Sequence, residues 1–128
     1  MTLATLASVA IGGALGATLR YAVSTWLASA AARGEFPWNT LLVNLAGTAI
    51  LAVLTALALN GKGLGDAWQT LLGPGFCGAL TTFSTVAVEL VLLVRAGATN
   101  HAVLYGTVSF LGAVALVVAI FAGLRVGR

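Results

Sequence analysis

Residues Gly73–Glu89, GPGFCGALTTFSTVAVE, decide the fold of this chain. The stretch lies inside an apolar segment, yet its first six residues include three Gly and one Pro, and Thr and Ser then surround Phe83. Because Pro lacks a backbone donor and Gly weakens a helix, a continuous helix is not expected here. A break within a membrane frees backbone groups that need partners inside the protein, and transporters hold ions at such breaks. The alternative is a kinked helix whose hydroxyls only bond to neighbouring helices.

The composition identifies the chain as an integral membrane protein. Of its 128 residues, 60% are hydrophobic and only 7% are charged, whereas soluble domains carry about a quarter charged residues. The net charge of +3 comes from scattered residues and not from a patch, which argues against nucleic-acid binding. The chain has three acidic residues and lacks a metal-ligand cluster or a catalytic triad, so we do not expect an enzyme. The single Cys77 is interpreted as a small packing residue.

Long stretches with few charges predict an all-α membrane protein with four transmembrane helices in one domain, residues 1–128. The third helix is expected to be broken near its middle. A cleavable signal peptide ending near Ala28-Ser29-Ala30 is the competing interpretation of the first segment, but no basic region precedes the apolar run. The predicted spans are 3–32, 37–60, 66–94 and 99–125.

The first span carries a face of small residues and one cation. Gly12 and Gly16, like Gly13 and Ala17, are four residues apart, a spacing that allows close helix approach. Arg20 lies towards the far half of the same span. A cation at such a position usually faces a protein interior or a water-filled cavity, and the alternative is that its long stem reaches the interface.

Two further spans carry polar residues on one helix face, because their members are four residues apart. These stripes are Thr40, Asn44 and Thr48 in the second span, and His101, Tyr105 and Ser109 in the fourth. An amide in hydrocarbon needs partners, so the default role of Asn44 is a hydrogen bond between helices. Glu89 is expected at the end of the third span, where a carboxylate reaches the interface or joins a polar path.

Loop charge gives almost no preferred orientation. With four spans, Lys62, Arg125 and Arg128 lie on one side of the membrane, and Arg33 and Arg95 lie on the other. Orientation normally follows a Lys/Arg excess on the cytoplasmic side. A chain with balanced loops can insert both ways, and oppositely inserted copies can pair as an antiparallel, dual-topology dimer.

Three ordered motifs resemble the Fluc/CrcB fluoride channels over nearly the whole chain. They are Gly12-Gly13-x-x-Gly16-Ala17-x-x-Arg20-Tyr21, Pro37-Trp38-x-Thr40-Leu41-x-Val43-Asn44-x-x-Gly47 and Gly75-Phe76-x-Gly78-x-Leu80-Thr81-Thr82-Phe83-Ser84-Thr85. The resemblance implies a passive fluoride-selective channel in the bacterial cytoplasmic membrane that lowers cytoplasmic fluoride. It also implies an inverted homodimer with a structural Na⁺ at its centre.

The resemblance also assigns residues. It implies that backbone carbonyls of Gly78 and Thr81 hold the Na⁺ and that Arg20 is the supporting cation of the first helix. The ion pathway would use Thr40, Asn44, Phe83, Val86, Glu89, Tyr105 and Ser109. Fluoride is strongly hydrated, so a pore must supply donors, and amides, hydroxyls and the positive edge of an aromatic ring qualify.

The chain departs from the family pattern at four positions. Val86 stands where the family has a second pore phenylalanine, and Asn39, Ala79 and Ala113 replace two glycines and a hydroxyl residue. Such a chain is alternatively a non-conducting subunit of a heterodimeric fluoride channel. A proton-coupled small multidrug exporter is the other alternative, and it would need a carboxylate deep within a helix.

Overall fold

The computed structural model describes residues 2–27 and 31–127, and this part of the chain contains helices and no strand. Four helical segments are long and apolar enough to cross a membrane, as predicted from composition. The elements in chain order are α1 (Leu3–Trp26), a 3-10 turn (Ala31–Arg33), α2 (Trp38–Leu59), α3 (Asp66–Thr70), a π-helical segment (Leu71–Cys77), α4 (Gly78–Leu80), α5 (Phe83–Arg95), α6 (Thr99–Thr107), a second π-helical segment (Val108–Gly112) and α7 (Ala113–Gly123).

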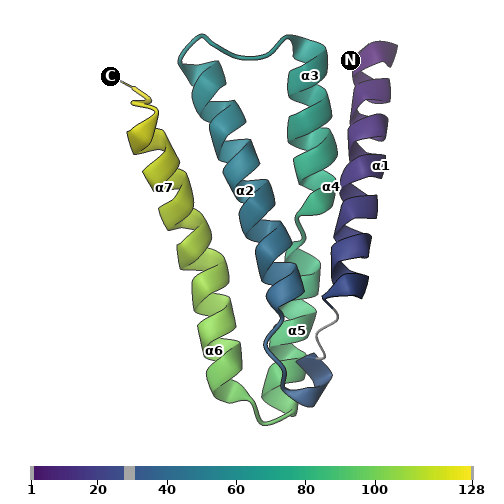
Figure 1. Ribbon diagram of the computed structural model, residues 1–128, viewed down its shortest axis with the longest axis vertical. Coiled ribbons are helices and arrows are strands. Elements are labelled where there is room, and N and C mark those ends of the chain that lie inside the picture. Colours follow the sequence, from purple (N-terminus) through teal and green to yellow (C-terminus); the bar gives the residue numbers. More distant parts are fainter. Residues whose placement is uncertain (1, 28–30, 128) are drawn as a thin grey trace.

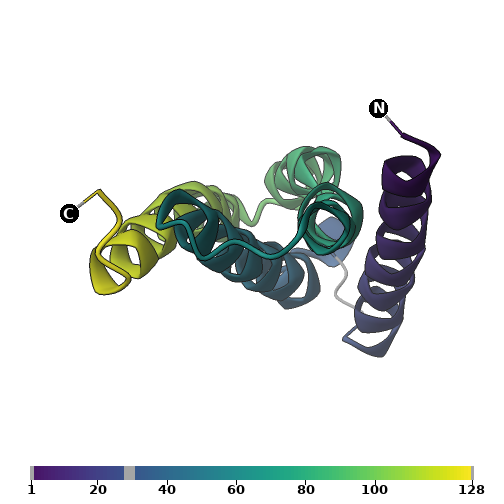
Figure 2. The ribbon, with the colours of Figure 1, turned by 90° about the horizontal axis from the view of Figure 1, so that it is seen from above.

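The four spans stand side by side (Figure 1). The loop between α2 and α3 lies at the same end as both labelled chain ends, and the loop between α5 and α6 lies at the opposite end. The third span is built from α3, the first π-helical segment, α4 and α5. Seen from above, α1 occupies one edge of the molecule and α7 the other (Figure 2), with α1 packed mainly on the third span.

The first candidate span, Leu3–Arg33, begins at a well-formed cap, and its long helix α1 covers only the first part of it. The backbone N–H of Thr5 donates to Thr2 Oγ1 at 3.2 Å, and this bond satisfies an amide that the first helical turn leaves free. The helix ends at Trp26, and Leu27 already leaves helical geometry at φ −102° and ψ 38°. Residues 28–30, where the alternative cleavage site falls, lie outside the described residues. The other three spans begin and end within two residues of the predicted bounds.

Two glycines of α1 let its backbone touch the third span. A methyl group added at Gly12 would overlap the carbonyl oxygen of Leu71, and one at Gly16 would overlap that of Phe76. Gly13, on another face, has open space around it, with nothing within 4 Å of an added Cβ. Close approach was predicted from the four-residue spacing, and Gly12 and Gly16 are the pair that makes it.

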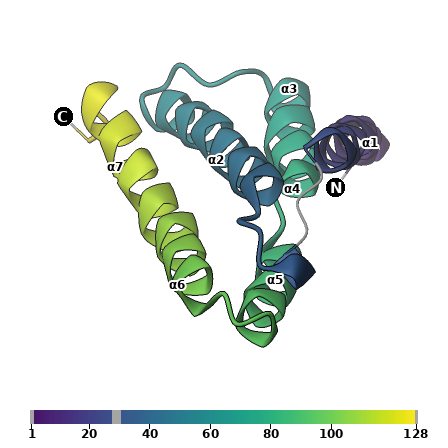
Figure 3. The same ribbon diagram turned by 60° about the horizontal axis from the view of Figure 1, so that its bottom comes forward.

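The third span is broken at its middle, but the break does not fall at the Gly-Pro cluster. Residues 71–77, which include Pro74, stay helical by forming the π-helical segment. Local π adjustments of this kind re-satisfy backbone groups that Pro and Gly disturb in membrane helices. The backbone becomes extended only at Thr81 (φ −82°, ψ 153°) and Thr82 (φ −151°, ψ 121°). Figure 3 shows this non-helical connection between α4 and α5.

Candidate functional site at the broken third span

Asn44 of α2 bonds to the backbone of the break at two points. Its Nδ2 donates to the carbonyl of Thr82 at 3.1 Å, and its Oδ1 accepts from the N–H of Thr82 at 2.7 Å. The interhelical hydrogen bond expected for Asn44 is therefore present. One side-chain amide replaces both bonds that an uninterrupted helix would have given Thr82.

The break interrupts the helical hydrogen bonds of the carbonyls that precede it. In an α-helix the N–H of residue i bonds to the carbonyl of residue i−4. The N–H of Thr82 bonds to Asn44 and not to Gly78, and the N–H of Thr85 bonds to Thr82 Oγ1 at 3.3 Å and not to Thr81. The carbonyls that lose their helical donors therefore include those of Gly78 and Thr81, the two residues to which the family resemblance assigns a cation.

Thr82 also forms the start of α5. Its Oγ1 caps the helix by accepting from the Thr85 N–H, and it lies 3.2 Å from Ser84 Oγ and 3.0 Å from Thr85 Oγ1. The carbonyl end of one half-helix therefore meets the amide end of the next. Carbonyl ends attract cations and amide ends attract anions, so the break offers opposite partial charges side by side.

Glu89 connects three spans through its hydrogen bonds. The prediction that it lies at a helix end is wrong. It lies at the middle of α5, which continues to Arg95. Its Oε1 accepts from Thr40 Oγ1 at 2.8 Å, and its Oε2 accepts from the Tyr105 hydroxyl at 2.6 Å. Hydrogen bonds to a carboxylate are stronger than those between neutral groups, so this triad links the second, third and fourth spans.

A groove of about 550 Å³ runs beside the break, and most of its walls are apolar. It is lined by residues of the second, third and fourth spans, and the sequence-predicted residues among them are Asn44, Thr48, Thr81, Phe83, Val86 and Ser109. The Oγ of Ser109 is buried and has no hydrogen-bond partner within the described residues. The Phe83 residue is 85% exposed in the single chain. An unpaired hydroxyl and an accessible ring edge thus lie in one groove.

Val86 lines the groove while packing into the core. The residue is only 7% exposed and belongs to a buried cluster that contains Leu41, Leu93 and Tyr105. Phe83, one turn earlier on α5, is almost fully exposed. The two positions therefore do not present equivalent surfaces, although the sequence placed them on one face.

Arg20 faces a small cavity on the other side of the break. The cavity has a volume of about 180 Å³, and its polar lining comes from Arg20, Ser24, Thr40, Thr82 and Thr85. The Arg20 residue is partly buried and has no hydrogen-bond or ion-pair partner in residues 2–27 and 31–127. Its position favours the interpretation of a cation that faces a cavity inside the protein.

The structure thus brings the predicted residues into three neighbouring groups. Asn44, Phe83, Val86 and Ser109 line the groove, Thr40, Glu89 and Tyr105 form the triad, and Gly78 and Thr81 lie at the break. Sequence reasoning missed Thr82 as the partner of Asn44. The sequence contained a signal for the position of Thr82, because a Thr that precedes a helix after a break is a favoured N-cap.

The described residues contain no group of three or more His, Cys, Asp or Glu side chains that could hold a metal ion. Backbone carbonyl oxygens are the ligands that the resemblance implies for a cation at this site. Hard cations accept such ligands, because carbonyl oxygens coordinate them as carboxylates do.

Comparison with known proteins gives consistent results. The profile of the CrcB-like protein family (Camphor Resistance, CrcB) matches residues 7–124. The chain is 40% identical over 120 residues to a protein of Thermus thermophilus named fluoride-specific ion channel FluC, which covers 93% of this chain and 90% of that protein. It is 38% identical over 106 residues to the Erythrobacter litoralis protein of the same name, covering 80% of this chain and 78% of that protein. A Bacillus subtilis protein named fluoride-specific ion channel FluC 2 is 38% identical over 120 residues, covering 93% of this chain and 87% of that protein.

Proposed function

The chain belongs to the CrcB-like protein family, and we propose that it is a fluoride-specific ion channel of the bacterial membrane that exports fluoride passively. It is a multi-pass membrane protein with four spans, and its relatives are named as channels and not as enzymes. The observation that carries the proposal is the polar break of the third span, which lies beside a groove containing donors for an anion.

The groove supplies donors that remain free in the structure. The amide Nδ2 of Asn44 has two protons, of which the Thr82 carbonyl takes one. The Ser109 hydroxyl has no partner among the described residues, and the exposed ring edge of Phe83 carries positive partial charge. A small hydrated anion that enters the groove can exchange water for these three groups.

Thr40 and Tyr105 would contribute to the ion pathway in a different way. Both hydroxyl protons are donated to Glu89, so neither is free for an anion in this arrangement. Their proposed place in the ion pathway therefore requires competition, in which fluoride and the Glu89 carboxylate share the same donors. Arg20, in the cavity next to Thr40, offsets part of the negative charge as an anion approaches.

We propose that two inverted copies form the channel. Phe83 is 85% exposed and Phe110 is 70% exposed, and both line the groove, so a single chain leaves its proposed ion pathway open on one side. The nearly balanced loop charges give neither orientation a strong advantage. A related non-identical subunit in place of the second copy is the alternative arrangement.

A Na⁺ ion fits the break in this assembly. The carbonyls of Gly78 and Thr81 have lost their helical donors, and Gly78 is an exposed residue in the single chain. When bound, the ion would neutralise inward-pointing carbonyl dipoles. Our proposal assigns it to Gly78 and Thr81 of both copies.

Flux measurements in liposomes test the function. Purified chain should release fluoride down its gradient when a K⁺ ionophore balances charge, and chloride in a parallel sample should stay inside. Absence of fluoride release from liposomes with cross-linked dimers would refute the homodimeric channel. Release only after a related subunit is added would indicate the heterodimer, and proton-driven export of organic cations would indicate the multidrug exporter.

A separate experiment tests the orientation in which the chain inserts into the membrane. Two Lys residues added to the loop at 96–100 should bias insertion one way, so that this variant alone loses fluoride flux. Co-expression with a copy biased in the opposite direction should restore the flux. Full activity of the biased chain alone would contradict an antiparallel assembly.

A further inference from the structure

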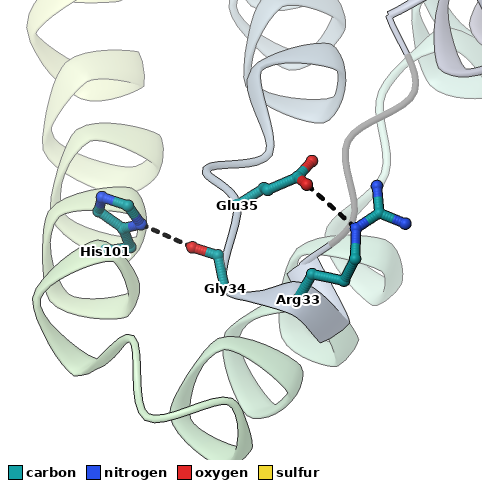
Figure 4. Close-up of polar contacts among 4 residues, drawn as sticks. All are labelled: Arg33, Gly34, Glu35 and His101. Carbon is teal, nitrogen blue, oxygen red and sulfur yellow. Dashed lines mark hydrogen bonds and ion pairs between the residues drawn. The ribbon is translucent and has the colours of Figure 1, made fainter.

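The linker between the first two spans packs against the third span through its 3-10 turn and contacts the fourth span through Gly34 and Phe36. Within residues 31–37, Ala31 is 5% exposed and Pro37 is among the fully buried side chains. His101 Nδ1 lies 2.8 Å from the carbonyl oxygen of Gly34, which joins α6 to the linker (Figure 4). Because a carbonyl only accepts, the Nδ1 atom carries the proton in this bond. The linker is therefore fastened to the first turn of α6.

Phe36 lies between this hydrogen bond and Tyr105. Its ring makes edge contacts with His101, at a centroid distance of 6.0 Å and an angle of 87°, and with Tyr105, at 5.6 Å and 78°. Trp38 packs on the same ring at 4.6 Å. Edge contacts of this geometry are favourable and orient both rings. One aromatic side chain thus connects the linker to the tyrosine whose hydroxyl binds Glu89.

We propose that residues 31–37 form a brace that holds the Tyr105 hydroxyl on Glu89, with Phe36 as a positioning residue and the His101–Gly34 hydrogen bond as the fastening. Tyr105 is fully buried, and its bond to Glu89 is short at 2.6 Å. Hydrogen bonds weaken steeply with distance and angle, so a small tilt of the Tyr105 ring would loosen the contact. Any role of Glu89 and Tyr105 in fluoride passage then depends on a linker that lines no part of the groove.

The exposed ion pair of the same linker provides a matched control. Arg33 Nε bonds to Glu35 Oε1 at 3.0 Å, and in Figure 4 this pair lies on the other side of the linker from His101. The side chains are 71% and 50% exposed, and exposed pairs contribute little to stability. Arg33→Gln should therefore leave the brace intact.

The first test measures fluoride flux and rests on the proposed function. Phe36→Leu keeps apolar volume but removes the ring contacts, and it should lower flux by about 3- to 10-fold, which lies at the lower end of the coupling between contacting residues. In a Tyr105→Phe background, which lacks the hydroxyl, the same substitution should change flux by less than about twofold, because Phe36 acts through that hydroxyl. Equal losses in both backgrounds would overturn the proposal.

The second test does not need a working channel. The chain has two tyrosines, so a protein labelled with ¹³C at the tyrosine ring gives two signals, and Tyr21→Phe assigns that of Tyr105. Phe36→Leu should shift the Tyr105 hydroxyl-bearing carbon toward its position in Glu89→Ala, whereas Arg33→Gln should not. An unmoved signal in folded Phe36→Leu would refute the brace even if the protein conducts. A moved signal in a chain without flux would support the brace and count against the channel.

His101 carries the test if Phe36→Leu does not fold. Its side chain is exposed, so His101→Ala removes the fastening with little disturbance of the core. His101→Ala should shift the Tyr105 signal in the same direction. His101→Asn, whose amide can still donate to the Gly34 carbonyl, should restore more than half of that shift. An unchanged signal in His101→Ala, or equal shifts in both variants, would contradict the fastening.

Discussion

Replacing Asn44 by Ala removes a two-point contact that no other side chain of the described structure supplies. The change deletes the bond from Nδ2 to the Thr82 carbonyl and the bond from the Thr82 N–H to Oδ1, of 3.1 and 2.7 Å. Each buried backbone group left without a partner costs about 1–3 kcal/mol. Two groups would give roughly 2–6 kcal/mol, and water that enters the groove beside them lowers this to about 2–3 kcal/mol.

The free energy of unfolding, measured by denaturant titration in mixed micelles, tests this value against a control on the same helix face. Thr48 lies one turn from Asn44 and lines the groove, but it has no hydrogen bond within the described residues. Thr48→Ala should therefore change stability by at most about 0.5 kcal/mol. Fluoride flux of Asn44→Ala should also be strongly reduced at temperatures where the protein is folded. An Asn44→Ala protein as stable as Thr48→Ala would show that Asn44 does not hold the break.

Three further substitutions test other parts of the structure. Gly12→Ala should lower the free energy of unfolding by about 1–3 kcal/mol, because its methyl group would overlap the Leu71 carbonyl. The control Gly13→Ala should be neutral or stabilise the protein by up to about 1 kcal/mol. Equal effects of the two substitutions in thermal melts would argue against the backbone contact. Phe83→Ile should leave protomer stability within about 0.5 kcal/mol, since the ring is 85% exposed, while liposome assays show loss of fluoride flux; full flux would mean that the ring is not used. Val86→Phe should lower the free energy of unfolding by about 1–3 kcal/mol through overpacking, because Val86 is only 7% exposed. Higher fluoride flux at an unchanged free energy of unfolding would contradict the buried position of Val86.

Local patterns in the sequence predicted the fold well. Uncharged stretches gave four spans, and the crowding of Gly and Pro indicated that the third is broken. The break lies within the predicted stretch 73–89, but beyond the Gly-Pro cluster, because Pro74 is accommodated in a π-helical segment and the chain unwinds at Thr81 and Thr82. A sequence pattern shows which residues disfavour an α-helix, but it does not show which alternative helix the packing selects.

The contacts that build the site were less predictable because they join distant parts of the chain. Asn44 and Thr82 are 38 residues apart, and Thr40 and Glu89 are 49 apart. Helical periodicity placed Thr40 and Asn44 on one face, and it placed Tyr105 and Ser109 on another. It carried no information on which faces meet, so Glu89 was placed at the end of the third span when it lies at the middle of α5 and between three spans.

The two π-helical segments have a consequence for the rotational register of the spans. Residues 71–77 precede the break, and residues 108–112 include Ser109 and follow Tyr105. A π-turn bonds residue i to i+5, so it completes one turn with one residue more than an α-turn. Deleting one residue from either segment would let that turn close as an α-turn, and the later side chains would keep nearly the same direction. A deletion within α3, where each residue turns the helix by about 100°, would instead aim every later side chain in a new direction and separate Thr82 from Asn44. The π-helical segments are therefore the places in these spans where the loss of one residue changes the rotational register least.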